Sequence, residues 1–329
     1  MRVLFLGGTG TISSACSALA VERGAELYLL SRGTSSRPAP AGAIVLRGDA
    51  RDPASVRAAL GDLTFDAVVD WIAFTPDHVE ADLASYTGRT RQLVFISSAS
   101  AYQKPPSLLP VTEATPLANP FWQYSRDKIA CEERLMRAWR EDGVPVTIVR
   151  PSHTYDERKL PVRGGWTAVD RMRRGLPVVV HGDGTSLWVL THHTDFARGF
   201  VPLLGNEEAV GHAFHITSDE VLTWNRIYEM VARAAGVDAP RLVHVASDRI
   251  ARFDAELGAS LLGDKAHSVV FDNAKIRRVA PDFRATIPFA RGAEEIVRWY
   301  DADPARRVVD AAFDRLTERL VADAERAVT

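Results

Sequence analysis

A glycine-rich segment directly after the first apolar stretch constrains the fold most strongly. Residues 3–6 are apolar, residues 7–13 read GGTGTIS, and a helical pattern follows over residues 12–23. A glycine turn between a strand and a helix lets backbone N–H groups and the helix N-terminus face a pyrophosphate. Ser13 stands where a third glycine is usual. The segment nevertheless predicts a dinucleotide site that includes Gly7, Gly10, Thr11 and Ile12.

Short apolar stretches alternate with helical patterns through the first half of the chain. This alternation is typical of β–α–β units and of a parallel sheet. The sequence predicts a fold of the α/β class, a doubly wound parallel (Rossmann) sheet, with a dinucleotide-binding domain over residues 1–150. The predicted strands cover residues 3–6, 27–30, 44–46, 67–69, 93–96 and 146–149, and the predicted helices cover 12–23, 53–60, 76–85 and 121–142.

The pattern becomes mixed after residue 150. Shorter apolar stretches at 178–180, 213–216 and 242–245 are separated by helical patterns. We therefore predict a smaller mixed α/β C-terminal lobe over residues 151–329 that binds substrate, with some chain returning to the Rossmann body.

Composition and charge disfavour several classes of function and make nucleic acid an unlikely partner. The chain has 40 basic and 42 acidic residues, so its net charge of −2 produces no field that attracts nucleic acid or an anionic membrane. No apolar stretch approaches a membrane-spanning length. Cys16 and Cys131 lack metal-ligand spacing, and His192 and His193 would point apart on a strand. We expect a cytoplasmic protein without a metal site.

Tyr124 and Lys128 are the candidate proton-transfer pair. They are four residues apart within a predicted helix, so they share one face of it. A cation near a phenol is expected to lower the pKa of the phenol toward working pH. Tyr155 and Lys159 have the same spacing, but they lie in a loop-like stretch before Pro161, and we interpret them as a chance match.

Polar residues follow several predicted strands, at the sheet edge where ligands bind. Ser98 and Ser100 follow the fifth strand, and a serine there could hydrogen-bond the substrate oxygen that exchanges a proton with Tyr124. The second strand ends with Ser31 and Arg32, which suit a 2′-phosphate better than an acidic residue does; this favours NADP over NAD. Asp49 could accept a hydrogen bond from adenine. The predicted cofactor site is completed by Ala50, Ala73 and Lys128.

With these residues placed, the sequence resembles the extended short-chain dehydrogenase/reductase superfamily, in particular the NAD-dependent epimerase/dehydratase family that includes UDP-galactose 4-epimerase. Residues 97–102 (SSASAY) resemble its serine motif, which makes Ser98 catalytic, and Tyr124 and Lys128 match its Tyr-x-x-x-Lys pair. Residues 150–155 (RPSHTY) resemble an Arg-Pro-x-Asn-x-Tyr segment near nicotinamide and substrate. This implies cofactor contacts for Pro151 and His153 and substrate contacts for His153.

Two departures from the family pattern concern the substrate. His153 stands where the family has asparagine, and Trp188 is the nearest match to an arginine that relatives often use for a sugar-nucleotide phosphate. Both are predicted to touch substrate. The glycine segment and Ser31-Arg32-Gly33 also resemble an atypical branch containing chloroplast stem-loop RNA-binding proteins.

Three functions follow as hypotheses. The first is an NAD(P)-dependent oxidoreductase or epimerase that acts at a carbinol or ketone carbon of a sugar or nucleotide-sugar-like substrate, with Tyr124 as general acid and base. The second is an NADPH-dependent ketoreductase of a keto-sugar or another natural product. The third is a cofactor-binding or RNA-binding scaffold without catalysis. The resemblance also implies a possible homodimer.

Overall fold

Seven short strands form one parallel sheet that carries the larger part of the molecule. A computed structural model describes residues 1–326. The strand order is β11-β6-β5-β4-β1-β2-β3, and the central strands are buried on both faces, which explains why they appear in the sequence as continuous apolar stretches. The strands are β1 (Arg2–Leu6), β2 (Glu26–Ser31), β3 (Ile44–Arg47), β4 (Ala67–Asp70), β5 (Leu93–Ile96), β6 (Val146–Pro151) and β11 (Ala213–Ile216).

Helices cover both faces of this sheet and complete two apolar cores. One core contains Cys16 of α1 and Phe196 of α6, and the other contains Val79 of α3 and Leu135 of α4. The first face carries α1 (Ser13–Glu22), α6 (His193–Phe200) and α10 (Ala274–Val279); the second carries α2 (Pro53–Leu60), α3 (Pro76–Tyr86) and α4 (Gln123–Asp142). The predicted fold class is confirmed.

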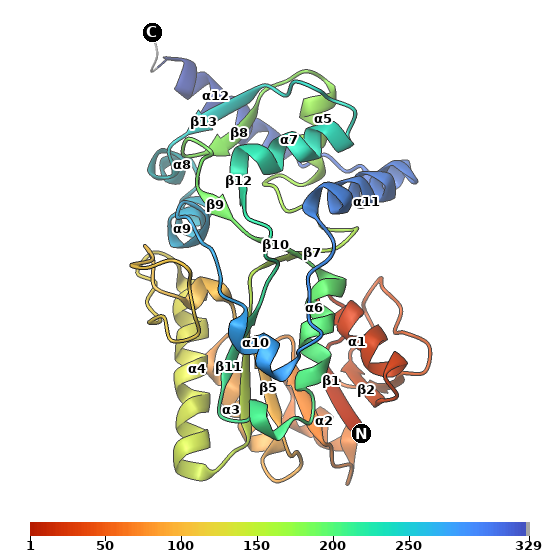
Figure 1. The fold of residues 1–329 in the computed structure, drawn as a ribbon. Helices are drawn as coiled ribbons and strands as arrows, with labels where there is room; N and C mark the ends of the chain where they lie inside the picture. Colours follow the sequence, from red (N-terminus) through yellow and green to blue (C-terminus); the bar gives the residue numbers. More distant parts are fainter. Residues whose placement is uncertain (327–329) are drawn as a thin grey trace.

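The second half of the chain contributes directly to the sheet. β11 pairs in parallel with β6, with Phe214 opposite Val149, and α10 lies beside β11 in the lower half of the molecule (Figure 1). Chain beyond residue 150 therefore does return to the sheet domain. The division at residue 150 itself stays a prediction, and residues 327–329 of the predicted lobe lie outside the described residues.

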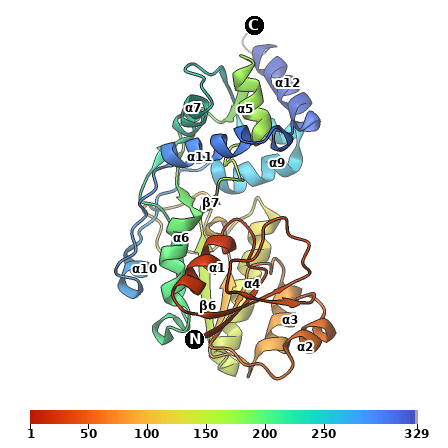
Figure 2. The ribbon, with the colours of Figure 1, turned by 90° about the vertical axis from the view of Figure 1, so that its right-hand side faces the viewer.

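The remaining elements form a smaller lobe that stands on the carboxyl edge of the sheet (Figures 1 and 2). Its core contains Trp188, Trp224 and Tyr228. Its strands pair as β7 (His153–Tyr155) with β10 (Leu190–His192), β8 (Val178–His181) with β13 (Leu242–Val245), and β9 (Leu187–Trp188) with β12 (Leu222–Thr223). Its helices are α5 (Trp166–Arg173), α7 (Trp224–Ala234), α8 (Ser247–Phe253), α9 (Ala255–Ser260), a π-helical turn (Leu261–Lys265), α11 (Phe289–Asp301) and α12 (Ala311–Arg326).

The predicted element boundaries differ little from the observed ones. The helix predicted from Phe121 begins at Gln123, because Trp122 keeps an extended backbone (φ −122°, ψ 121°). α2 begins with Pro53, where the Asp52 carboxylate accepts a hydrogen bond from the Ala54 N–H, as proline and aspartate at a helix start predict. Within residues 1–326, no helix has the length and apolar character needed to cross a membrane.

Candidate active site

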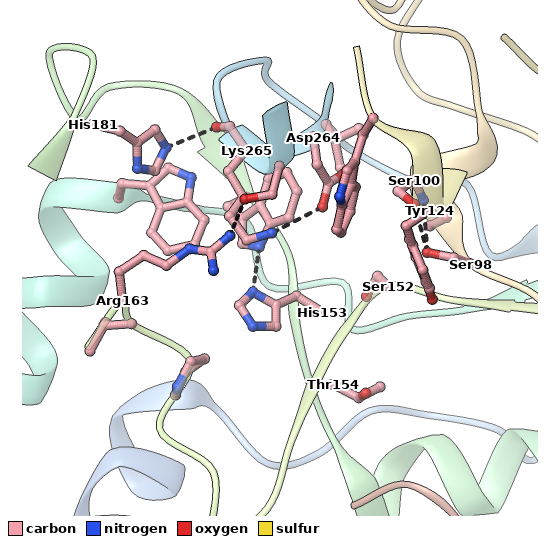
Figure 3. Close-up of a pocket in the computed structure, with 18 of the residues that line it drawn as sticks. Ser98, Ser100, Tyr124, Ser152, His153, Thr154, Arg163, His181, Asp264 and Lys265 are labelled. Carbon is pink, nitrogen blue, oxygen red and sulfur yellow. Dashed lines mark hydrogen bonds and ion pairs between the residues drawn. The ribbon is translucent and has the colours of Figure 1, made fainter. Parts of the chain in front are cut away.

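Hydroxyl groups from β5 and α4 meet at the carboxyl edge of the sheet. Ser98 lies just beyond β5 and caps the 3₁₀ turn Ala99–Ala101, while Tyr124 lies in the first turn of α4. Ser98 is close enough to lower the pKa of the Tyr124 hydroxyl, and both side chains lie at one end of the cavity (Figure 3). The structure therefore brings together the two hydroxyls predicted to be catalytic.

Two further serines extend this group of hydroxyls. The oxygen atoms Ser98 Oγ and Ser100 Oγ are 2.9 Å apart, and Ser125 Oγ donates a hydrogen bond of 2.8 Å to Ser100 Oγ. Ser125 follows Tyr124 in α4, so these bonds join the strand end to the helix start. Ser100 lines the same cavity as Ser98, and it supports Ser98 from behind.

Lys128 shares the helix face with Tyr124 but directs its ammonium at the backbone. Its Nζ atom donates to the carbonyl oxygens of Ala73 (2.6 Å) and Ile96 (2.7 Å) and lies 5.9 Å from the centroid of the Tyr124 ring. Burial lowers the pKa of Lys128 to about 8. The lysine is not among the residues that line the cavity, although Tyr124 of the same helix is.

The predicted effect of Lys128 on Tyr124 is wrong for this structure. The pKa of Tyr124 is raised, because burial of the phenol outweighs the lowering hydrogen bond from Ser98, and the nearby Asp264 carboxylate adds to the rise. Lys128, whose ammonium lies 5.9 Å from the centre of the phenol ring, is not among the groups that shift this pKa. Tyr124 is therefore a protonated phenol at neutral pH, ready to donate.

The glycine loop fits a dinucleotide. Gly7 and Gly8 have φ angles of +98° and +105°, and a Cβ atom on Gly8 would lie 2.6 Å from a methyl carbon of Leu29. Helix α1 begins at Ser13, and its N-cap residue Ile12 provides no side-chain cap, so the first N–H groups of the helix can face an anion. Ser13 replaces the third glycine by accepting a 2.8 Å hydrogen bond from the Gly10 N–H.

The ends of β2 and β3 carry two exposed arginines. Arg32 follows β2, and the guanidinium of Arg47, the last residue of β3, donates to the Arg32 carbonyl oxygen at 3.1 Å. Arg47 lies so close to Gly33 that a Cβ atom there would overlap its guanidinium. Asp49 accepts a hydrogen bond from the Arg51 N–H, which occupies one of its carboxylate oxygens. Sequence reasoning missed Arg47.

A cavity of about 740 Å³ runs from these hydroxyls into the smaller lobe. Figure 3 shows Ser98 and Tyr124 at one end and Arg163 and His181 at the other. Seven of the predicted residues line it: Ile12, Ser98, Ser100, Tyr124, Pro151, His153 and Trp188. Gly7, Gly10, Thr11, Ser31, Arg32, Asp49, Ala50 and Ala73 do not, and Ala50 and Ala73 are buried.

The two residues that depart from the family pattern contact one another. The indole N–H of Trp188 donates to Nδ1 of His153 at 3.1 Å. Burial and the neighbouring cations, of which Lys265 is the strongest, hold the pKa of His153 well below its usual value. A neutral imidazole that accepts at Nδ1 carries its proton on Nε2, so His153 presents a donor without a charge.

Several residues of the cavity wall escaped sequence reasoning. The π-helical turn places Asp264 and Lys265 in the wall, where Asp264 pairs with Lys104 (3.4 Å) and with Lys265 (3.2 Å). Arg163 joins them from the loop before α5 and hydrogen-bonds Ser260. No spacing in the sequence connects these residues, although π-helical turns often occur at functional sites.

Other sequence features have structural roles. Tyr155 and Lys159 do not share a helix: Tyr155 ends β7, and its buried hydroxyl has no hydrogen-bond partner among the described residues. The prediction that His192 and His193 point apart is wrong, because β10 ends at His192 and α6 begins at His193. Their ring centroids are 4.7 Å apart, and His193 Nδ1 lies 3.1 Å from the Thr11 carbonyl oxygen.

Comparison with known proteins identifies relatives over most of the chain. Residues 3–217 match the family model described as the NAD dependent epimerase/dehydratase family. The sequence is 30% identical over 295 residues to a 2′-dehydrokanamycin reductase of Streptomyces kanamyceticus, covering 86% of this chain and 80% of that protein. It is 27% identical to a chloroplast stem-loop binding protein of 41 kDa from Arabidopsis thaliana, covering 74% of this chain but only 65% of that protein.

The fold is shared with solved structures across almost its whole length. A UDP-glucose 4-epimerase of Thermus thermophilus, solved in complex with NAD, superposes with a TM-score of 0.71 at 23% identity, covering 92% of this chain and 99% of that chain. At this level of identity the similarity concerns the fold.

Proposed function

The chain is an enzyme of the NAD-dependent epimerase/dehydratase family, and we propose that it uses NADPH to reduce a ketone carbon of a sugar. The proposal rests above all on one observation: Ser98 and Tyr124 lie at the same end of a cavity that is also lined by Ile12 of the glycine-rich segment. A resemblance in sequence alone would not require that arrangement.

The residues of the chain can manage the oxygen of the ketone. When bound, NADPH supplies a hydride to the ketone carbon. Tyr124, a protonated phenol in this environment, donates its proton to the oxygen as negative charge develops there, and Ser98 hydrogen-bonds the same oxygen. Lys128 lies one helical turn further on; two of its N–H groups donate to the carbonyls of Ala73 and Ile96, and the third is the one that would bind the ribose.

Arg32 and Arg47 support NADPH over NADH. They stand at the ends of β2 and β3, where NAD-binding sheets use an acidic residue to hold the ribose hydroxyls. Two guanidinium groups favour a 2′-phosphate, because charge-assisted hydrogen bonds to phosphate are stronger than hydrogen bonds between neutral groups. A dissociable reductant also suits net reduction better than epimerisation, in which the hydride returns to the substrate.

His153 and Trp188 support a substrate without a phosphate at this position. Together they offer an uncharged Nε2–H donor and aromatic surface, which match a hydroxyl or carbonyl oxygen of a sugar. The similarity to a 2′-dehydrokanamycin reductase points the same way, since that name describes reduction of a ketone.

A reductase assay tests the proposal. Purified enzyme, NADPH and 2′-dehydrokanamycin should give stoichiometric loss of the absorbance of reduced nicotinamide, with NADH much less effective. Incubation with NAD and UDP-glucose tests for epimerisation, which would yield UDP-galactose without net oxidation of cofactor. Turnover only in the epimerase arm would refute the reductase proposal. RNA binding that weakens with salt and no turnover in either arm would favour the scaffold hypothesis.

The cytoplasmic location and the homodimer stay predictions from sequence.

A further inference from the structure

A cluster of three charged side chains lies buried behind Lys128, outside the cavity. The Arg51 guanidinium donates to the carboxylates of Asp70 (2.6 Å) and Asp82 (3.2 Å). The Asp70 and Asp82 side chains are 1% and 4% exposed, and that of Arg51 is 22% exposed. The three residues come from the loop after β3, the end of β4 and the middle of α3.

Asp70 fixes the turn that follows β4. Its second carboxylate oxygen accepts hydrogen bonds from the backbone N–H groups of Ile72 (2.6 Å) and Ala73 (2.8 Å). The N–H of Phe74 donates to Nδ1 of His78 at 3.0 Å. Three successive N–H groups of this turn are thus held by side chains, so the direction of each carbonyl group in it is fixed.

The same turn supplies the acceptor for the lysine of the active site. Lys128 Nζ donates to the Ala73 carbonyl oxygen and lies 4.8 Å from the Phe74 ring centroid. The Ala73 residue therefore receives a hydrogen bond from Lys128 on its carbonyl and gives one to Asp70 from its N–H. One residue separates the buried cluster from the ammonium.

We propose that the Arg51–Asp70–Asp82 cluster is a positioning device for Lys128, which acts by holding the turn after β4 so that its carbonyl meets the ammonium. The role rests on the proposed function, in which Lys128 binds the ribose of NADPH. Arg51, Asp70 and Asp82 touch neither substrate nor cofactor in this scheme; they act through Ala73.

The energetics favour a positioning role over a purely stabilising one. Burying a guanidinium and two carboxylates carries a desolvation cost that apolar side chains of similar size would avoid. Apolar side chains could not accept hydrogen bonds from the N–H groups of Ile72 and Ala73. They therefore could not hold the Ala73 carbonyl toward Lys128. Burial and the neighbouring Asp70 carboxylate also raise the pKa of Asp82 well above its usual value.

Titration of Lys128 gives a readout that needs no substrate. The charged or titratable groups that face its ammonium are Cys131, Asp70, Glu132 and Arg51, and the rings of Phe74, Phe95 and Tyr124 surround it. The chain has only five lysines. Carbon NMR of protein labelled at the lysine Cε, with Lys128→Arg to assign the signal, should show Lys128 titrating near pH 8 in the wild type.

Arg51→Lys is the decisive variant. It keeps the positive charge, but one ammonium cannot bridge both carboxylates in the planar geometry of a guanidinium. We expect faster hydrogen exchange at the Ile72 and Ala73 amides, a displaced Lys128 titration, and NADPH affinity lowered about tenfold, as changes behind a binding residue commonly cause. Asp70→Asn should move the Lys128 titration to lower pH, because a neighbouring negative charge is lost.

Two controls separate positioning from general loss of charge. Asp301→Asn removes an exposed carboxylate that binds Arg173 through two 2.7 Å hydrogen bonds in the smaller lobe, and it should change none of these readouts. Asp82→Asn leaves the hydrogen bonds from Asp70 to the turn in place and should have less effect than Asp70→Asn. If Asp70→Asn does not fold, Arg51→Lys alone decides.

A folded Arg51→Lys protein with wild-type exchange at Ala73 and a wild-type Lys128 titration would overturn the proposal. Both measurements are made without cofactor. Failure of the wild-type protein to bind NADPH would therefore refute the proposed function and still leave the positioning of Lys128 open to this test.

Discussion

The two ends of the cavity are built in different ways. At the sheet edge, Ser98, Tyr124 and Lys128 come from one strand end and one helix, and the backbone places them. At the far wall, Arg163, His153 and Lys265 come from a loop, a short strand and a π-helical turn, and long-range packing places them. The first end has a fixed geometry that suits proton transfer. The second end is assembled from segments that lie far apart in the chain, and under the proposed function it selects the substrate.

This comparison predicts that changes at the sheet edge lower turnover, whereas changes at the far wall weaken substrate binding. The largest effect is expected for Tyr124→Phe, which removes the proton donor. Turnover of 2′-dehydrokanamycin should fall by about 10²- to 10⁴-fold, while the Kd for NADPH changes little.

Tyr155→Phe is the matched control. Its hydroxyl is buried without a partner among the described residues, so its loss should leave turnover intact and the Tm equal or higher. Normal turnover in Tyr124→Phe would contradict the role given to the sheet edge.

The second largest effect concerns the cofactor. Arg32→Gln with Arg47→Gln removes both guanidinium groups at the ends of β2 and β3, and the preference for NADPH over NADH should fall about ten- to hundredfold, as loss of charge-assisted hydrogen bonds implies. Ratios of kcat/KM for the two cofactors measure this. Arg57→Gln, on the exposed face of α2, should leave the ratio unchanged; an unchanged ratio in the double variant would point to NAD.

A third test uses pH. The pKa of Lys128 is lowered to about 8, so its ammonium is charged below that pH and neutral above it. The affinity for NADPH should therefore weaken as pH rises through about 8. Lys128→Arg keeps a cation at all these values and should flatten the profile. Identical profiles for the two proteins would show that the charge of Lys128 does not hold the cofactor.

The smallest effect is expected at the far wall. Trp188→Phe keeps an aromatic ring but removes the N–H that binds Nδ1 of His153, which frees the imidazole to change tautomer. The KM for 2′-dehydrokanamycin should rise about three- to tenfold with kcat nearly constant, the size of one neutral hydrogen bond. Trp299→Phe, on α11, is the control. A lower kcat in Trp188→Phe with an unchanged KM would contradict the different roles given to the two ends of the cavity.

The same contrast explains what the sequence could predict. The position of Tyr124 follows from helical periodicity, and that of Ser98 follows from a buried strand of four residues, so both signals are local. Asp264 and Lys265 enter the cavity through a π-helical turn, for which no periodic pattern exists. The sequence also could not predict where the Lys128 ammonium points, because its acceptors are the backbone carbonyls of Ala73 and Ile96.

The pairing of β11 with β6 has a consequence for any shortened form of the chain. β6 is buried along its whole length, and its outer edge is covered only by a strand that arrives more than sixty residues later. A fragment ending at residue 150 would leave that apolar edge with unpaired N–H and C=O groups, which invite pairing with other chains. The dinucleotide-binding half is therefore expected to aggregate when expressed without the segment that supplies β11.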